Sequence, residues 1–298
     1  MSKKWFARPA IALATGLFIL AGADAAAAQN LYGVNPFSNT GGSSSSGLFY
    51  LDNTTGAIID GRVITVPSRT IIGAQGLTRD PTTGVIYAIA RASGVTGRLL
   101  ITIDLATGSG VEVGNLGDNF ASITFRSDGQ LFGVTGDGAT VPETLYLINK
   151  ATAAKTLATT LGNGSDGEVI AYNSSDGFIY HWSGSSSNPV FERIQSVSPY
   201  TVTNIPISGS ATAEVFGAVW NPAISQFQVH DIGSVMSYWT TSGVRGNNQP
   251  ATLADVRGLA LVPNIAPVPT MTEWAMILLT MALAGTAALV IQRRHGNS

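Results

Sequence analysis

The chain has 298 residues, of which 45% are hydrophobic and 11% are charged, so it can bury a large core and is poor in charge. It contains no cysteine, which excludes a disulfide framework, a cysteine–metal site and a thiol nucleophile. Between Leu31 and Val262 there are 16 acidic and 11 basic residues and no basic run, so we expect no nucleic-acid partner.

The N-terminal residues have the pattern of a secretory signal. Three basic residues lie among the first eight, an apolar stretch covers residues 10–23, and small residues suited to cleavage lie just before Gln29. The sequence therefore predicts that residues 1–28 form a signal peptide and that the protein is exported. An uncleaved anchor helix is the alternative, although the apolar stretch is shorter than the ~20 residues that span a membrane.

A unit of short strands separated by turns repeats along the middle of the chain. Its clearest copy covers residues 121–153. In successive copies the second strand begins at residues 86, 131, 179 and 226. This spacing of 45 to 48 residues is typical of propeller blades that contain several strands each. We find no long stripe of apolar residues at a 3.6-residue period, which a helical repeat would require.

The two ends of this region complete the number of units. Residues 31–34 match a second strand that lacks a first, whereas residues 258–262 match a first strand that lacks a second. Joining them makes a fifth blade and removes the open edges of the strand array. We therefore expect an all-β fold, with a five-bladed β-propeller over residues 29–262 closed by its N- and C-terminal strands. Six or seven blades, one of them degenerate, is the alternative.

The turns before these strands carry a resemblance to a known kind of repeat. Residues 80–84 read Asp-Pro-Thr-Thr-Gly and are followed by Ile-Tyr-Ala at residues 86–88. This resembles the degenerate repeat Asp-Pro-x-Thr-Gly-x-Leu-Tyr-Gly of secreted bacterial propeller proteins, and related turns recur over most of the chain. The resemblance implies a fold and says almost nothing about function.

The C-terminal end is predicted to be a membrane-sorting tail. A proline-rich linker at residues 263–268 leads into the tail at residues 269–298. Residues 274–291 are long and apolar enough for a transmembrane helix. The basic residues Arg293 and Arg294 follow this helix and would stop transfer on the cytoplasmic side. We expect an inner-membrane anchor with the propeller outside the cytoplasm, or release to the cell surface or matrix.

The start of the tail resembles the IPTL-type C-terminal sorting signal of Gram-negative bacteria, Ile-Pro-Thr-Leu-Ser-Glu-Trp-Gly before a helix and a basic end. The residues that carry this resemblance are Val268, Pro269, Thr270, Met271, Glu273 and Trp274. Four of them are identical to the pattern, whereas Val268 and Met271 depart from it conservatively. The resemblance implies that an exosortase-type membrane protease handles the tail. A plain single-span membrane anchor is the alternative.

A candidate binding site follows from aligning the first strands of the five units. The aligned residues are Gln75, Ala121, Glu168, Phe216 and Arg257. First strands line the channel of a propeller, so these residues would ring one mouth of it, with Gln75, Glu168 and Arg257 as candidates for ligand binding. Alternatively, Glu168 and Arg257 form an ion pair that plugs the channel. Glu168 is also the acid that we would test as a general base.

Other residue types with chemical potential are interpreted as structural. His181 and His230 lie at blade spacing, too far apart to share a metal ion, so each is interpreted as an ordinary strand or loop residue, and we predict neither metal nor cofactor. Four aromatic residues gather in the last two full units: Trp182, Trp220, Tyr238 and Trp239. They are interpreted as blade core, the alternative being a surface that stacks on glycans or peptides.

Three functions remain open from the sequence. The first is a non-catalytic surface propeller that binds an extracellular polysaccharide or a surface protein. The second is a hydrolase or lyase that acts at the channel mouth, and the third is a structural surface protein without a ligand. We favour the first, because the sequence contains no Gly-x-Ser-x-Gly motif or other catalytic constellation.

Overall fold

The computed structural model describes residues 29–41, 45–162, 168–185, 188–209, 213–233, 235–250 and 255–264, together with the helical residues 279–281 and 283. The predicted signal peptide and most of the predicted sorting tail lie outside the described residues. Within the described part of the chain, no helix combines the length and the apolar character needed to cross a membrane.

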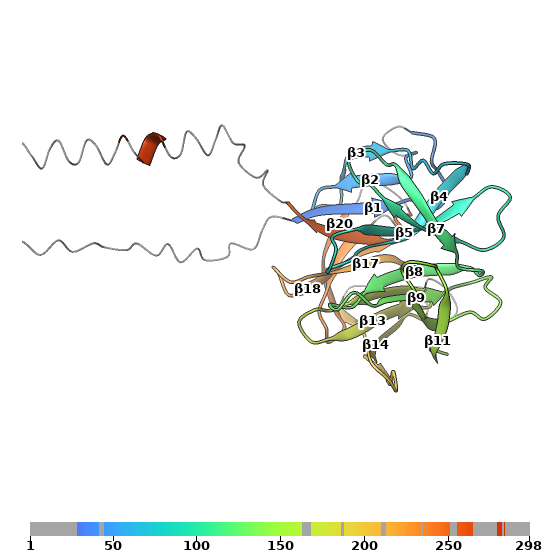
Figure 1. Ribbon diagram of the computed structural model, residues 1–298. Coiled ribbons are helices and arrows are strands. Elements are labelled where there is room, and N and C mark those ends of the chain that lie inside the picture. Colours follow the sequence, from blue (N-terminus) through green and yellow to red (C-terminus); the bar gives the residue numbers. More distant parts are fainter. Residues whose placement is uncertain are drawn as a thin grey trace, which may run out of the picture.

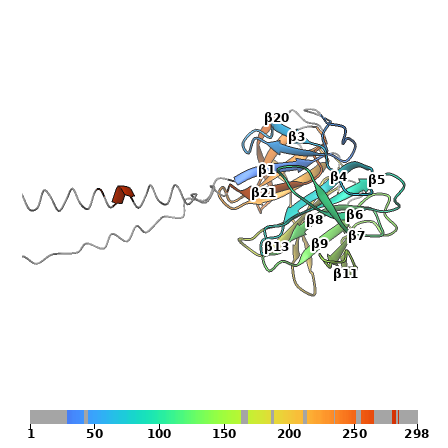
Figure 2. The same cartoon turned by 45° about the horizontal axis from the view of Figure 1, so that its top comes forward.

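The described strands form five sheets around a central axis, each sheet being one blade (Figures 1 and 2). Blade 2 consists of β4 (Ile71–Arg79), β5 (Ile86–Ala92), β6 (Leu99–Ile103) and β7 (Gly110–Asn115). Blade 3 consists of β8 (Phe120–Phe125), β9 (Leu131–Thr135), β10 (Thr144–Ile148) and β11 (Lys155–Thr160). Within each blade, strands that follow one another in the chain pair antiparallel.

The next two blades follow the same plan. Blade 4 consists of β12 (Val169–Tyr172), β13 (Phe178–Ser183), β14 (Val190–Gln195) and β15 (Val202–Asn204). Blade 5 consists of β17 (Val215–Asn221), β18 (Gln226–Asp231), β19 (Val235–Trp239) and β20 (Val244–Pro250). The short strand β16 (Ser208–Gly209) adds to the outer edge of blade 5, parallel to β20.

Blade 1 joins the two ends of the propeller region. It consists of β21 (Leu259–Pro263), β1 (Gln29–Val34), β2 (Leu48–Leu51) and β3 (Ile58–Arg62). The strands β1 and β21 pair antiparallel, with Gly33 opposite Leu259. The inner strands contact one another in the order β4, β8, β12, β17, β21 and back to β4, which closes the ring. The predicted five-bladed propeller, closed by its N- and C-terminal strands, is confirmed.

One kind of turn connects strands throughout the molecule. An aspartate or asparagine side chain accepts a hydrogen bond from the backbone N–H two residues later, at 2.8 to 3.0 Å. These residues are Asp52, Asp80, Asp104, Asn149, Asn173 and Asn221. Asx side chains favour such turns because they satisfy the backbone locally. The fifth residue of each loop has a positive φ, which glycine adopts in four loops and Ala153 and Ser225 adopt in the other two.

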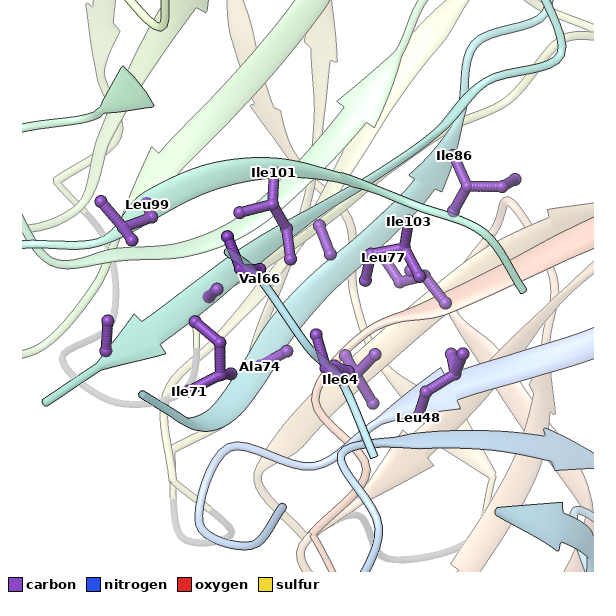
Figure 3. Packing of buried hydrophobic residues seen from close by; sticks show 14 of the residues in the cluster. Leu48, Ile64, Val66, Ile71, Ala74, Leu77, Ile86, Leu99, Ile101 and Ile103 are labelled. Atoms are coloured by element: carbon purple, nitrogen blue, oxygen red, sulfur yellow. The ribbon is translucent and has the colours of Figure 1, made fainter. Parts of the chain in front are cut away.

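The hydrophobic core lies between neighbouring blades. Figure 3 shows the cluster between blades 1 and 2, which contains Leu48 of β2, Ile64 and Ile101 of β6. A second cluster, between blades 4 and 5, is aromatic and brings the Trp182 and Trp239 rings within 6.2 Å. The four aromatic residues at positions 182, 220, 238 and 239 are at most 7% exposed, so their interpretation as core is confirmed.

The inner strands approach so closely that glycine is required at the closure. Gly258 has a φ of +127°, and a Cβ atom there would lie 2.6 Å from the Leu77 nitrogen and 2.7 Å from the Gly76 nitrogen. The Gly76 amide donates a hydrogen bond to the Arg257 carbonyl at 2.5 Å. Backbone therefore packs against backbone between β4 and the start of β21, which leaves only a narrow space at this end of the axis.

Candidate functional site

The structure brings the five aligned positions together at one end of the channel. Ala121 and Phe216 lie near the starts of the inner strands β8 and β17, and Gln75 lies in the middle of β4. Glu168 directly precedes β12, and Arg257 lies two residues before β21. All five line one cavity of about 90 Å³, which we call the mouth cavity. The cavity is also lined by Arg98, Asn119, Gly136, Asp137, Val169 and Glu214.

The ion pair that would plug the channel does not form. The Arg257 Nε lies 2.5 Å from Asp255 Oδ1, and its guanidinium carbon lies 3.6 Å from the centre of the Phe216 ring. The Glu168 Oε2 lies 2.6 Å from His181 Nε2, and its Oε1 accepts a hydrogen bond from Ser183 Oγ at 2.8 Å. Glu168 and Arg257 therefore line the same cavity with separate partners.

His181 forms the centre of a buried charged cluster. Its Nδ1 lies 3.1 Å from Glu192 Oε2, on the side of the ring away from Glu168, and all three side chains are fully buried. Burial lowers the pKa of His181, but the hydrogen bonds to Glu168 and Glu192 and their charges outweigh it and raise the pKa to about 9. His181 lies in a strand, β13, as interpreted from the sequence, but its charged cluster with Glu168 and Glu192 was not predicted. The antiparallel register, which sets His181 opposite Glu192, is the signal that could have found it.

The cluster is not arranged as a metal site or as a nucleophile with its base. Glu168 and Glu192 contact opposite nitrogens of the His181 ring, so the three side chains do not converge on one point. Among the residues that the structure describes, no group of three or more ligating side chains could hold a metal ion. Ser183 donates to Glu168, and both His181 nitrogens already face carboxylates, so His181 is not placed to activate the Ser183 hydroxyl.

Positive charge also gathers at the mouth cavity. Burial, together with the charges of Arg91 and Arg257, lowers the pKa of the Arg98 guanidinium to about 10. The guanidinium groups of Arg91 and Arg257 lie 5.1 Å and 5.0 Å from the centre of the Phe37 ring. Sequence reasoning missed Arg98 because it lies between β5 and β6, away from the inner strands whose alignment located the site.

The other end of the channel has a different lining. It forms a cavity of about 200 Å³ at the ends of the inner strands. Of the residues that line it, Arg79 is the one with a charged side chain. The concentration of charge at the mouth cavity is thus a property of one end of the propeller, which makes that end the candidate binding site.

The five closed blades define the protein as a β-propeller. Residues 266–295 match the family model of the IPTL-CTERM motif. The chain is therefore a propeller protein with an IPTL-CTERM motif near its C-terminal end, a combination that fits a surface-sorted protein. No match was found among curated proteins.

Several solved structures are similar to this chain. One is from the nidogen/laminin complex, with 10% identity, coverage of 79% of this chain and 98% of that chain, and a TM-score of 0.49. Another is TolB from Acinetobacter baumannii, with 15% identity, coverage of 79% and 67%, and a TM-score of 0.47. A third is a protein of unknown function from Bacteroides thetaiotaomicron, with 16% identity, coverage of 74% and 49%, and a TM-score of 0.42. This chain spans about half the length of the Bacteroides protein.

Proposed function

We propose that the protein is an exported surface propeller that binds an extracellular polysaccharide or surface protein at the mouth cavity, without catalysing a reaction. The observation that carries this proposal is the cavity itself, which all five aligned positions line and in which Gln75, Glu168 and Arg257 present polar groups. Convergent polar groups at the mouth of a channel are typical of ligand recognition. The fold alone would say nothing about function.

The surroundings of Glu168 suit a role in binding. Both of its carboxylate oxygens are engaged, one by His181 and the other by Ser183. These hydrogen bonds hold the carboxylate in one orientation, in which its remaining lone pairs are fixed acceptors for ligand hydroxyl or amide groups.

We also propose roles for the two ends of the chain. Residues 1–28 would direct export and be removed, and the tail at residues 269–298 would be handled by an exosortase-type membrane protease, with the helix at residues 274–291 held in the inner membrane until then. Arg293 and Arg294 would keep the end of the tail in the cytoplasm. The IPTL-CTERM match at residues 266–295 supports this part of the proposal.

Binding is tested with the full chain, purified in detergent, and isothermal titration calorimetry against extracellular polysaccharides and envelope proteins. We expect Glu168→Gln and Gln75→Ala to weaken binding of the partner at least tenfold. The control is Arg79→Gln, which changes the charged residue at the other channel end and should leave affinity unchanged. Equal affinity in all variants, or the absence of any partner, would contradict a binding role for the mouth cavity.

Sorting is tested separately by fractionation of a Gram-negative host that has an exosortase. The wild-type chain should appear in a shortened form outside the inner membrane, whereas a Glu273→Ala and Trp274→Ala double variant should stay at full length in the membrane fraction. The control is Ile224→Ala, an exposed change in the propeller. Identical processing of all three chains would contradict the role given to the tail.

A further inference from the structure

The side chains of Arg91 and Arg98 are partly buried and have few hydrogen-bond partners. The Nε atoms of both are buried and have no hydrogen-bond partner among the residues that the structure describes. Arg91 donates a hydrogen bond from Nη1 to the Pro36 carbonyl at 2.7 Å. Of the three arginines Arg91, Arg98 and Arg257, Arg257 is the one that forms an ion pair within the described part of the chain. A desolvated cationic donor without an acceptor costs free energy, so an anion bound here would stabilise the site by accepting hydrogen bonds that none of the described residues accepts.

An unsatisfied acceptor lies in the same cavity. The Asn119 side-chain nitrogen donates to the Asp137 carbonyl, which fixes the orientation of the amide. The Asn119 Oδ1 is buried and has no partner among the described residues. At the mouth cavity, as far as the described residues go, the Arg98 Nε therefore lacks an acceptor, and the Asn119 Oδ1 lacks a donor such as a hydroxyl group. A ligand with an acidic group next to a hydroxyl group supplies both.

We propose that the mouth cavity binds the anionic group of an acidic sugar in an extracellular polysaccharide, either the carboxylate of a uronic acid or a sulfate ester. Arg98 and Arg257 would pair with the anion, and Asn119 Oδ1 would accept a hydrogen bond from a neighbouring sugar hydroxyl. This inference rests on the proposed function, since it names the ligand class of the same site. Guanidinium groups suit planar carboxylates and sulfates because they offer paired donors.

The size and rim of the cavity define how such a sugar would lie. The volume of about 90 Å³ is well below the ~300–1,000 Å³ of pockets that enclose small molecules, so it admits the acid group while the sugar ring stays at the rim. Phe37, which contacts Arg91 and Arg257, is 63% exposed. Its ring offers an apolar surface at the rim for the carbon face of the sugar.

The carboxylates of the cavity also favour acidic sugars over inorganic anions. Asp137, Glu168 and Glu214 line it together with Arg98 and Arg257. They repel a bare multivalent anion but accept hydrogen bonds from sugar hydroxyls. We therefore expect inorganic phosphate and sulfate to bind weakly compared with a sugar that carries one acid group. Added salt should weaken binding of the acidic sugar, because the cavity is open to solvent.

The experiment is isothermal titration calorimetry with the full chain in detergent and three sugars of matched length: oligogalacturonate, a sulfated galactan oligosaccharide and a neutral galactan oligosaccharide. At least one acidic sugar should bind at least tenfold more tightly than the neutral one. The carboxylated and sulfated arms identify the source of the acid group. Arg98→Gln and Phe37→Ala should each weaken acidic-sugar binding at least tenfold, whereas Arg193→Gln, at an exposed cation–π contact in blade 4, should not.

A thermal melt of the ligand-free protein separates a binding role of Arg98 from a structural one. We expect the melting temperature of Arg98→Gln to equal or exceed that of the wild type, since the variant removes a buried charge that faces two other arginines. A large loss of stability would overturn the inference. Equal binding of neutral and acidic sugars, reduced by Glu168→Gln but not by Arg98→Gln, would overturn it while leaving the proposed function intact. No binding of any sugar or protein partner would overturn both.

Discussion

Tyr32 of β1 lies opposite Ala260 of β21 in an antiparallel ladder that runs from Gln29 to Gly33 on one strand and from Leu259 to Pro263 on the other. These residues come from opposite ends of the propeller region. Their pairing places β1 between β21 and β2, so that blade 1 has an inner strand from one end of the region and three further strands from the other. The ring is thus closed by backbone hydrogen bonds rather than by side-chain packing alone.

The glycine at this closure should be intolerant of any side chain. Gly258→Ala places a Cβ atom 2.6 Å from the Leu77 nitrogen at a φ of +127°, so we expect a loss of at least ~3 kcal/mol in the free energy of unfolding. The control is Gly246→Ala in β20, where nothing lies within 4 Å of the added Cβ atom, and where a change under ~1 kcal/mol is expected. Urea denaturation measures both. Similar losses in the two variants would contradict the close approach of the inner strands.

The sequence predicted the ring well because its turns repeat. Asp80 and Asp104 form the same turn with the same hydrogen bond, and each turn starts or ends a strand whose place in a blade is then known. The repeat also located the closure, since a unit was split between the chain ends. The outer strands were harder to predict: β11 and β15 are partly exposed and have weak apolar patterns.

One turn offers a stabilising substitution. Ser225 occupies the position that glycine holds in four related turns, with a φ of +53°. A residue with a Cβ atom is strained there, and Ser225 is exposed, so Ser225→Gly should raise the free energy of unfolding by roughly 1 kcal/mol. Ser225→Ala keeps the strain and serves as the control. A gain of the same size in both variants would show that the backbone conformation is not the cause.

The buried histidine should make stability depend on pH. The pKa of His181 rises from the ordinary value of 6.5 to about 9 in the folded protein, because the two carboxylates outweigh the cost of burial. The folded pKa exceeds the unfolded one, so the stabilisation is fully present below about pH 6.5 and is lost as pH rises through about 9. The urea concentration at the midpoint of unfolding should therefore be highest at pH 6, lower at pH 7.5 and lowest at pH 9.

The Glu192→Gln variant tests the cause of this dependence. It keeps a hydrogen-bonding group beside His181 Nδ1 but removes one of the two negative charges that raise the histidine pKa. The fall in stability should then be smaller and end at a lower pH than in the wild-type protein. A wild-type protein with constant stability between pH 6 and 9 would contradict a charged His181.

Two ion pairs of similar length should differ in their contribution to stability. The Asp231–Arg245 pair spans 3.0 Å at 3% and 4% exposure, whereas the Asp60–Arg62 pair spans 2.7 Å at 51% and 30% exposure. Asp231→Ala leaves a buried cation unpaired, so it should cost ~3–5 kcal/mol in the free energy of unfolding. Asp60→Ala should cost at most ~1 kcal/mol, since water replaces the lost partner. Equal costs in urea denaturation would contradict the burial of the first pair.

The candidate site was only partly predictable. Aligning the first strands brought Glu168 and Arg257 to one cavity, because equivalent positions in a ring of blades lie at the same height along the axis. The side chains that surround Glu168 and Arg257 do not occupy equivalent positions in the blades. His181 reaches Glu168 and Glu192 across the strands of one blade, and Arg98 reaches the mouth cavity from a connection between outer strands. Contacts of this kind depend on register and side-chain length, which a repeat pattern does not encode.

Closure of the ring is tested most directly by a cross-link between its two ends. The chain has no cysteine, so in a Tyr32→Cys and Ala260→Cys double variant no other thiol can react with the two that are introduced. Directly opposed residues of an antiparallel pair are close enough for a disulfide. Under mild oxidation, mass spectrometry should find one peptide that joins residues 32 and 260 within a monomer. Free thiols, or disulfides that form only between molecules, would contradict the closed propeller.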